Sequence, residues 1–382
     1  MAKDCYEIIL NHNCDLACRF CSQSDFSPGA RTSAAEAVKR IYGARKAGYK
    51  RLGFSGGEAL LRRDLPSLVA AARKVGFKAV RLQTNGMKLA DAALARSLAK
   101  AGLSVCKFTF LGHKPAVHDA LTGKAGAFAA SLRGLDNMLA LRLAVGVNLL
   151  ITRSNYRSLP AALAFFMRRG VTGFVLIYPR YSGSMLRNYR RHGVPLPQAA
   201  TFVQKALDLA SASGLDGDIK ALNMPPCALG RHGGKAVDLY KFNTAIYSPL
   251  GFSWDLDKNT AGSKEQGPPC PACSFRKKCR GLDKTYLRLF GWKGIGRAAQ
   301  TKQAPPPKPL KGYLNAMESC FMEILKTENR VGTRRVLELA AAIPLCQDCR
   351  DGANVLSTGQ ALEKKGLVRR DFEKGGYIWR LA

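Results

Sequence analysis

Acidic side chains are scarce in this chain of 382 residues, which has 27 Asp and Glu against 60 Lys and Arg. The formal net charge of +33 favours polyanionic partners, namely nucleic acid, a membrane surface or an acidic peptide. A generally basic, solvated surface explains the same charge equally well, because net charge reports on association and not on fold. From residue 301 onward there are 14 basic and 9 acidic residues, so the excess lies mainly in residues 1–300.

Long apolar stretches are also missing. No run approaches the roughly 18 residues that span a bilayer, and residues 1–5 do not begin the apolar core of a secretory signal. These absences exclude a membrane-spanning protein and predict a cytoplasmic chain with no membrane partner. In a reducing compartment, the 12 cysteines indicate metal or redox sites more often than disulfides.

Three of these cysteines stand together, directly after a short apolar strand expected at residues 6–10. Cys14, Cys18 and Cys21 have the spacing C-x3-C-x2-C. Thiolates so arranged can hold three irons of a four-iron cluster and leave the fourth iron open to a small molecule. A zinc site with His12 as the fourth ligand is the alternative, and the spacing favours the cluster.

This stretch, with the aromatic Phe20 before the third cysteine, resembles the signature of the radical SAM superfamily. The resemblance implies a [4Fe-4S] cluster that binds S-adenosylmethionine. An electron donor then drives cleavage of the cofactor to a 5′-deoxyadenosyl radical, which abstracts hydrogen from a substrate. Ser55, Gly56, Gly57 and Glu58 follow the next expected strand and resemble the family's Gly-Gly-Glu motif, which binds the amino group of the cofactor. The glycines allow close approach of a ligand and the carboxylate can accept from an ammonium, although a plain strand-to-helix turn is the alternative.

Strands and helices alternate over residues 1–215, which predicts an α/β fold with a parallel sheet and right-handed crossovers. The expected strands are 6–10, 50–54, 78–83, 103–111, 144–152 and 173–178. The expected helices are 32–47, 65–75, 91–101, 128–139, 159–169 and 201–213. This pattern suits the partial (β/α)6 barrel that the resemblance implies, with the active site at the carboxyl ends of the strands.

Polar residues near those strand ends are candidate cofactor contacts, with capping or turn roles as the alternative. Asn85 lies in a turn that resembles the family's third-strand turn, and Thr109 stands where many relatives have serine. Leu111 replaces the acid of that pattern, which puts any role of that acid in doubt. Asn148 and Arg153, on and after the fifth strand, are expected to reach the ribose and carboxylate of the cofactor.

Two loops carry further polar side chains. His118 and Asp119 have the chemistry of acid/base groups, but ordering of their own loop is the favoured interpretation. The basic segment 181–192, with Arg187, Arg190 and Arg191, has the side chains to meet a polyanionic substrate. A mobile, solvated loop is the favoured interpretation of that segment.

A second cysteine set lies in residues 216–300, where the alternation is lost and short strands are expected at 236–243 and 245–254. Cys227, Cys270, Cys273 and Cys279 supply four thiolates, enough for a complete cluster or for a structural zinc site. The arrangement resembles the auxiliary-cluster modules called SPASM and twitch. Asp283 stands where the full SPASM pattern has a further cysteine, so one auxiliary [4Fe-4S] cluster, closer to twitch, is the prediction.

The remaining chain begins with a proline-rich linker at 301–311. Helices expected at 312–326, 333–342 and 354–365, then a hairpin over 366–380, resemble a winged helix in residues 312–382. Nucleic acid is one candidate partner of this tail, although its basic stripe is weak, and peptide binding or dimerisation are the alternatives. Cys320, Cys346 and Cys349 also lie here and are interpreted as structural or inert thiols, because a fourth metal ligand is not found.

The sequence therefore predicts a radical SAM enzyme with an auxiliary cluster, acting on a peptide or protein that the tail recognises. The preference for peptides comes with the family. A radical SAM enzyme that modifies RNA and a non-enzymatic iron–sulfur DNA-binding sensor are the alternatives. No catalytic side chain is assigned.

Overall fold

The computed structural model describes residues 4–215, 218–238, 243–296, 307, 310, 312–341, 343, 352–373 and 376–382. Its main body is built on a ten-stranded sheet in the order β10-β9-β1-β2-β3-β4-β5-β6-β7-β8. Neighbouring strands from β9 through β1 to β8 run parallel, and β10 is antiparallel to β9. The strands are β1 Cys5–Ile9, β2 Arg51–Ser55, β3 Ala79–Thr84, β4 Val105–Phe110, β5 Ala144–Leu150, β6 Gly173–Ile177, β7 Ile219–Leu222, β8 Ala236–Val237, β9 Thr244–Tyr247 and β10 Ser253–Asp255.

All six strands expected before residue 215 are present, and the sheet is parallel as predicted. The sheet does not stop there, however, because β7, β8, β9 and β10 from the following segment extend it at both edges. The expected strand at 236–243 is shorter, and residues 239–242 lie outside the described part. The boundary expected at 215 therefore does not coincide with an edge of the sheet.

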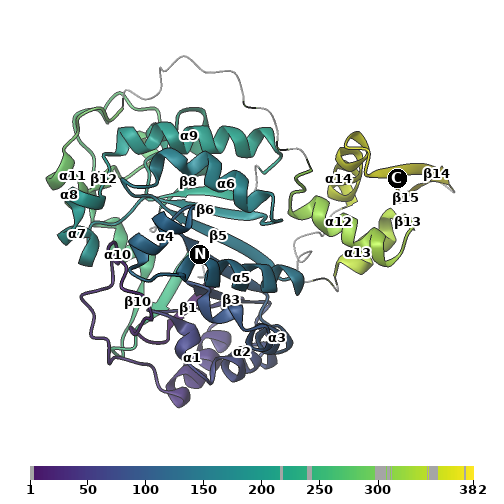
Figure 1. Cartoon of the computed structure of the whole chain (residues 1–382), viewed down its shortest axis with the longest axis horizontal. Helices are drawn as coiled ribbons and strands as arrows, with labels where there is room; N and C mark the ends of the chain where they lie inside the picture. Colours follow the sequence, from purple (N-terminus) through teal and green to yellow (C-terminus); the bar gives the residue numbers. More distant parts are fainter. Residues whose placement is uncertain are drawn as a thin grey trace.

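Helices follow the strands, and most of them cover one face of the sheet (Figure 1). These are α1 Ala34–Lys46, α2 Leu65–Lys74, α3 Ala92–Lys100, α4 Pro115–Thr122, α5 Ala127–Ala140, α6 Leu159–Met167 and α9 Leu196–Ala212. The short α7 Gly183–Arg187 and α8 Tyr189–His192 lie to one side, next to α11 in Figure 1. Local signals explain where several begin: Ser33 Oγ accepts from Glu36 N at 3.1 Å, and Asp91 Oδ1 accepts from Ala93 N at 2.8 Å. No helix among the described residues combines the length and apolarity needed to cross a bilayer.

The sheet has two unlike faces. Along β3 and β4, buried and partly accessible positions alternate over the whole strand. The buried set, such as Leu82 and Phe108, packs with the helices into one apolar core. Because side chains alternate across a strand, the other set faces away from these helices. We call this second surface the inner face; its polar members include Glu7, Ser55, Arg81, Gln83, Lys107, Thr109, Asn148 and Lys220.

Beyond β10 the chain forms short elements around the second cysteine set. They are α10 Leu256–Ala261, β11 Lys264–Glu265, β12 Leu282–Asp283 and α11 Lys284–Phe290, with β11 and β12 pairing antiparallel. Single turns of 3₁₀ helix occur at Ala59–Leu61, Met87–Ala90, Tyr156–Ser158 and Arg276–Lys278, and a longer, kinked one at Pro226–Lys235.

The tail, residues 312–382, has a core of its own and stands to one side of the main body in Figure 1. It contains α12 Ala316–Thr327, β13 Val331–Gly332, α13 Thr333–Ala340, α14 Gly352–Lys364, β14 Val368–Glu373 and β15 Gly376–Leu381. Three helices and the hairpin were expected; the short β13, which pairs with β15, was not. Most of the expected linker lies outside the described residues.

The tail cysteines differ from the expectation in one respect. Cys320 lies in α12, 2% exposed, and is disulfide-bonded. It is therefore not a free thiol, whereas a structural role, the other part of the interpretation, agrees with its burial. Cys346 and Cys349 lie outside the described residues.

Candidate active site and metal centres

The first cysteine set lies on the loop that leaves β1. Cys14 is exposed, and Cys18 and Cys21 are half-buried. Although Cys14 is exposed as a whole residue, desolvation of its thiol by the surrounding loop raises the pKa of Cys14 to about 11. Burial, and then the neighbouring Cys14 and Cys21, raise the pKa of Cys18. The three thiols are therefore close enough to influence one another, and a metal would have to displace their protons because the thiolate is the ligand.

The backbone of this loop is held by the segment after β4. Ala17 N donates to Thr122 O and Arg19 N to Leu121 O, both at 3.0 Å. Gly123 ends α4 with φ of +73°, and a Cβ there would lie 3.0 Å from Ala17 O. The segment that contains His118 and Asp119 thus fixes the cysteine loop.

The side chains of His118 and Asp119 hydrogen-bond to the backbone of their own segment and so help to fix it. His118 is 1% exposed, and its Nδ1 accepts from Leu111 N at 3.3 Å while the ring packs on Phe110 and Phe128. Burial lowers the pKa of His118 to about 4. Asp119 accepts from Gly126 N at 2.7 Å and from Phe128 N at 2.8 Å. These contacts agree with the loop-ordering interpretation and give neither residue an acid/base role.

The other side of the cysteine loop is fastened to α7. Ser184 N donates to Cys21 O at 2.9 Å and to Ser24 Oγ at 2.7 Å. Arg187 donates to Ser24 Oγ at 2.8 Å and forms an ion pair with Asp25. The segment 181–192 is therefore mostly helical and bound to the cysteine loop, so its interpretation as a mobile, solvated loop is wrong. Its sequence could not reveal this, because the partners lie 160 residues away.

The Gly-Gly-Glu segment follows β2 and lies against the start of the cysteine loop. Gly57 N donates to Asn11 O at 2.9 Å and Glu58 N to Asn13 O at 2.7 Å. A Cβ on Gly56 would lie 2.4 Å from Asn11 O, and one on Gly57 would lie 2.2 Å from Asn13 O. Both positions accept only glycine without movement of the backbone, so these residues bring the ends of β1 and β2 together.

Glu58 joins these strand ends to β3. It is 1% exposed, and its carboxyl oxygens accept from Leu60 N at 2.9 Å, Thr84 Oγ1 at 2.8 Å and Asn85 N at 2.7 Å. Burial raises the pKa of Glu58 to about 7, although these donors favour the ionised form. Three protein donors use three of the roughly four acceptor sites of this carboxylate. Its expected contact with the amino group of a cofactor therefore stays a prediction.

Asn85 connects this network back to the cysteines. Its Nδ2 donates to Asp15 Oδ1 at 2.7 Å, and its Oδ1 accepts from Met87 N at 3.0 Å. Asp15 lies between Cys14 and Cys18 and was not singled out from the sequence, although an acid inside a cysteine triplet was a visible signal. Cys14, Glu58 and Asn85 therefore belong to one connected set.

The remaining expected contacts are more dispersed. Thr109 and Asn148 are register partners on the inner face, and Asn148 Nδ2 donates to Gln83 Oε1 at 3.4 Å. Arg153 is exposed, and its Nε donates to Gly193 O at 3.0 Å. Phe20 packs partly buried against the main core, and Ser55 O accepts from Leu10 N at 2.8 Å. Of these five, Ser55, Thr109 and Asn148 lie on the inner face by strand alternation, and Thr109 and Asn148 are direct register partners.

The second cysteine set lines a pocket of about 410 Å³, to which Cys227, Cys270, Cys273 and Cys279 all contribute. Burial, and then the other three cysteines, raise the pKa of Cys227 to about 12. Gly267 N donates to Cys270 Sγ at 3.4 Å and Gly281 N to Cys279 Sγ at 3.3 Å. Amide donors of this kind stabilise thiolate sulfur and tune iron–sulfur centres.

The loops around this pocket leave no room for a side chain at Gly281. Its φ is +88°, and a Cβ there would lie 1.7 Å from Glu265 O. Gln266 Nε2 reaches across the same loops to Arg276 O at 2.9 Å and Cys279 O at 2.6 Å. The four thiols are thus held by a preformed backbone, and the donor set suits a four-iron cluster.

In neither cysteine set do the side chains converge on a position for one metal ion. Within the described ranges, no three His, Cys, Asp or Glu side chains are arranged to hold a single metal ion. A four-iron cluster is larger than one ion, so its ligands need not converge so closely. His12, the candidate fourth zinc ligand, stacks on Phe26 with ring centroids 4.8 Å apart.

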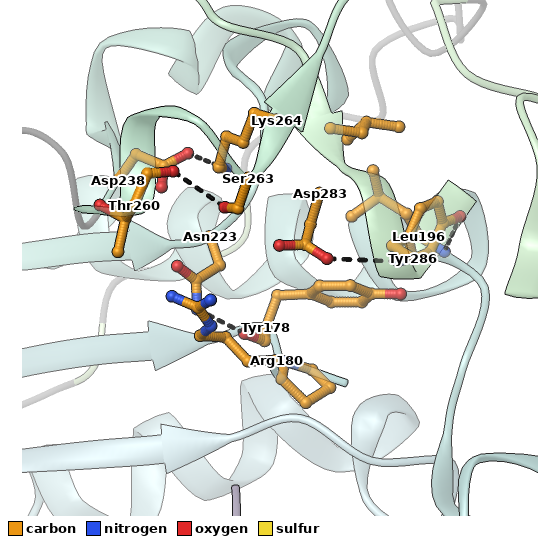
Figure 2. Close-up of a pocket in the computed structure, with 12 residues that line it drawn as sticks. Tyr178, Arg180, Leu196, Asn223, Asp238, Thr260, Ser263, Lys264, Asp283 and Tyr286 are labelled. Carbon is orange, nitrogen blue, oxygen red and sulfur yellow. Dashed lines mark hydrogen bonds and ion pairs between the residues drawn. The ribbon is translucent and has the colours of Figure 1, made fainter. Parts of the chain in front are cut away.

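A polar cluster lies between the carboxyl end of β6 and the loops of the second cysteine set (Figure 2). Lys264 forms a buried ion pair with Asp238, and Asn223 Nδ2 donates to Tyr178 O at 3.0 Å. Asp283 caps α11 by accepting from Thr285 N at 2.9 Å. The position expected to hold a further cysteine in a full SPASM pattern therefore has a structural role here.

Comparison with known proteins agrees with this geometry. Residues 8–165 match the sequence model of the radical SAM superfamily. The chain is 36% identical over 130 residues to Fe-coproporphyrin III synthase of Methanosarcina barkeri, which covers 34% of this chain and 32% of that protein. The chain thus matches about a third of the length of this curated relative.

Solved structures give the same fold. Streptococcus suis SuiB bound to precursor peptide SuiA has a TM-score of 0.58 at 14% identity, covering 75% of this chain and 73% of that chain. Native anSMEcpe with bound AdoMet and Cp18Cys peptide has a TM-score of 0.54 at 14% identity, covering 81% and 93%. Residues 8–165 therefore match the radical SAM superfamily, and this match and the curated relative support an enzyme with radical SAM chemistry. The solved structures show the shared fold.

Proposed function

We propose that Cys14, Cys18 and Cys21 ligate a [4Fe-4S] cluster at which S-adenosylmethionine binds. The observation that carries this proposal is the connected set at three adjacent strand ends. There, Gly56 and Gly57 touch the base of the cysteine loop, and Glu58 and Asn85 tie that loop to β3. When bound, the cluster and its cofactor supply one-electron chemistry that yields a 5′-deoxyadenosyl radical for hydrogen abstraction.

The chain's own residues have supporting roles. The Gly-Gly-Glu segment, which the family resemblance assigns to the amino group of the cofactor, packs through its two glycines on the backbone of the cysteine loop. Thr109 and Asn148 offer a hydroxyl and an amide on the inner face for the polar parts of a bound molecule. Phe20 and Ser55 border the site through the cysteine loop and the end of β2. Arg153 is the weakest of the proposed contacts, because Gly193 O already accepts from its Nε.

We further propose that Cys227, Cys270, Cys273 and Cys279 ligate one auxiliary [4Fe-4S] cluster. The shared pocket and the two amide-to-sulfur hydrogen bonds support this over four unrelated core cysteines. Iron analysis tests it: the reconstituted chain should hold about eight irons, and the double variant Cys270→Ala/Cys273→Ala, which leaves two of the four thiolates, about four. An unchanged iron content in this double variant would refute the auxiliary cluster.

The proposed substrate is a peptide or protein. Two of the solved structures with this fold, SuiB and anSMEcpe, are described with bound peptides. Residues 312–382, with three helices and a hairpin, are proposed to form a winged-helix-like domain that recognises such a substrate. An iron tetrapyrrole is the second candidate, because the relative with 36% identity is an Fe-coproporphyrin III synthase.

Nucleic acid is a weaker partner for this tail. Arginines of its hairpin and nearby loop are already paired with carboxylates: Arg330 with Glu373 at 2.6 Å, Arg370 with Glu363 at 3.0 Å, and Arg380 with Asp371 at 3.1 Å. Such pairing reduces the positive footprint that phosphate contact requires. The RNA-modifying and DNA-sensor alternatives therefore gain no support from the tail.

The experiment that tests the primary proposal is anaerobic. The chain is reconstituted with iron and sulfide, mixed with S-adenosylmethionine and a strong reductant, and assayed for 5′-deoxyadenosine by mass spectrometry. We expect product from wild type and from Cys5→Ala, whose thiol is buried in β1, but none from Cys18→Ala. Absence of product from a wild-type chain loaded with iron would overturn the proposed function.

A further inference from the structure

The inner face presents an unusual polar surface at mid-sheet. Glu7 forms an ion pair with Arg81 and accepts from Gln83 Nε2 at 3.1 Å. Glu7, Gly53 and Arg81 are register partners on β1, β2 and β3. A Cβ on Gly53 would lie 3.0 Å from Glu7 Oε2, so glycine makes room for this pair. The carboxylate of Glu7 is thereby already matched by one cation and one amide.

Lys107 lies on the neighbouring strand β4 and, among the described residues, has no carboxylate or amide partner of this kind. It is the register partner of Gln83 on β3 and of Gly146 on β5. The described residues include no hydrogen-bonding or ion-pairing partner for its ammonium, whereas an ammonium offers three donors. Burial, followed by the like charges of Arg81 and Lys220, lowers the pKa of Lys107 to about 8. An unpaired cation at such a position costs stability unless a ligand uses it.

The surroundings of Lys107 leave space beside it. Gly146 and Gly173 are register partners on the next two strands, and neither has a side chain to cover the lysine. A Cβ on Gly146 would lie 3.5 Å from Lys107 Cγ, so the aliphatic stem lies over this glycine backbone. Lys107 stays partly accessible.

Neutral hydrogen-bonding groups lie on the cofactor side of this cation. Thr109 is two residues closer to the carboxyl end of β4 and points to the same face, and Asn148 is its register partner on β5. An ammonium flanked by a hydroxyl and an amide provides the donors that a carboxylate accepts.

We propose that Lys107, assisted by Thr109 and Asn148, binds a carboxylate group of the substrate on the inner face of the sheet. This inference rests on the proposed function, because it is the cofactor site at the strand ends that makes this surface a substrate surface. It narrows the substrate to a molecule with an acidic side chain, a free carboxyl terminus or another carboxylate. Lys107 lies in the middle of β4, two residues before Thr109, and the cofactor is proposed to bind at the carboxyl ends of the strands.

The test reads Lys107 directly in the full-length, cluster-loaded chain with S-adenosylmethionine present. Succinate is the probe, and its neutral diamide, succinamide, is the matched control. Acetylation by acetic anhydride at pH 8 is quantified at Lys107 and at the exposed Lys39 by mass spectrometry. Succinate should slow acetylation of Lys107 about fivefold or more, because a bound carboxylate raises a lysine pKa by about one unit or more. Succinamide should not slow it, and Lys39 should be unaffected.

Three outcomes would overturn the inference. One is equal acetylation of Lys107 with succinate and with succinamide. Another is strong protection of Lys107 by S-adenosylmethionine alone, which would make the cofactor and not the substrate the source of the carboxylate. The third is full protection in Thr109→Val, which keeps the shape of the side chain but removes the hydroxyl. None of these requires product formation, so failure of the radical assay alone would refute the proposed function and leave this binding result separate.

Discussion

Gly57 is a residue at which one carbon atom decides whether two strand ends can meet. A Cβ at this position would lie 2.2 Å from Asn13 O and 2.6 Å from His12 O, both backbone atoms of the cysteine loop. The backbone atoms cannot rotate away as a side chain would, so the loop itself would have to move. The role of this glycine is therefore close approach and not a special φ.

Gly57→Ala is expected to abolish 5′-deoxyadenosine formation and to lower iron retention at the first cysteine set. Gly43→Ala is the matched control, because Gly43 is exposed in α1 and a Cβ there meets nothing within 4 Å. That control should be stabilised by about 0.5–1 kcal/mol, since alanine is the better helix former. Normal activity in Gly57→Ala would show that the loop does not need this approach.

His118 predicts a specific pH dependence of stability. Its folded-state pKa, about 4, lies below the ordinary value of 6.5, so folding favours the neutral ring. The stabilisation is present above about pH 6.5 and is lost as the pH falls toward 4. Between pH 7.5 and pH 5.5 the wild type should lose about 1 kcal/mol more than His118→Gln. Urea unfolding at the two pH values measures this, and equal losses in the two proteins would contradict it.

At the scale of elements, α7 acts as a clamp on the cysteine loop. Arg187 contacts Ser24 and Asp25, and the backbone of Ser184 meets Cys21 O. These contacts are exposed, so each is worth little as an ion pair, but together they restrict the loop that carries Cys21. The clamp and the hydrogen bonds to Leu121 and Thr122 hold the loop from two sides.

Arg187→Ala should therefore release iron faster from the first cysteine set while the fold stays intact. Arg190→Ala is the control, since Arg190 is also exposed in this basic segment but contacts only its neighbour Tyr189 among the described residues. Iron loss to a chelator, followed by absorbance, should be several-fold faster in Arg187→Ala than in Arg190→Ala or wild type. Identical rates of iron loss in all three proteins would show that the contacts of Arg187 do not stabilise the cysteine loop.

Local pattern predicted the regular elements well but not the long-range contacts. Strands β1 to β6 were visible because apolar runs and alternation repeat between helices. Strands β7 to β10 were mostly missed as members of the main sheet, because two to four residues give no clear period. The pair Glu7–Arg81 joins positions 74 residues apart, and no local signal matches such partners. The two cysteine sets could be proposed as cluster ligands from the sequence because the spacing of ligands is itself a local pattern.

At the scale of the whole molecule, the chain has two apolar cores. The main core includes Tyr313, which packs with residues of the sheet and helices, and the tail core begins at α12. Among the described residues, the polar contacts between the two bodies include Asn315 Nδ2 to Gly214 O at 3.3 Å, Arg142 to Glu323 at 3.2 Å and Lys365 Nζ to Tyr313 O at 2.9 Å. This arrangement predicts that the tail can unfold while the main body keeps its structure.

Trp379 offers the test of that independence. It is fully buried in the tail core, packs edge-on against Phe321 with ring centroids 5.5 Å apart, and its Nε1 donates to Thr333 Oγ1 at 3.3 Å. Trp379→Ala should cost about 3–5 kcal/mol, a large share of the stability available to so small a core. We expect rapid proteolysis within residues 316–382 of this variant, with 5′-deoxyadenosine formation by the main body retained.

Phe372→Ala is the control for this experiment, because Phe372 belongs to the same hairpin but is 68% exposed. It should leave both the proteolysis pattern and the cofactor cleavage unchanged. If Trp379→Ala instead abolished cofactor cleavage, the tail would be an integral support of the main body. Retained cleavage with a digested tail would show that residues 312–382 are not needed for cofactor cleavage, and the proposed role in substrate recognition could then be tested by measuring peptide binding in the two variants side by side.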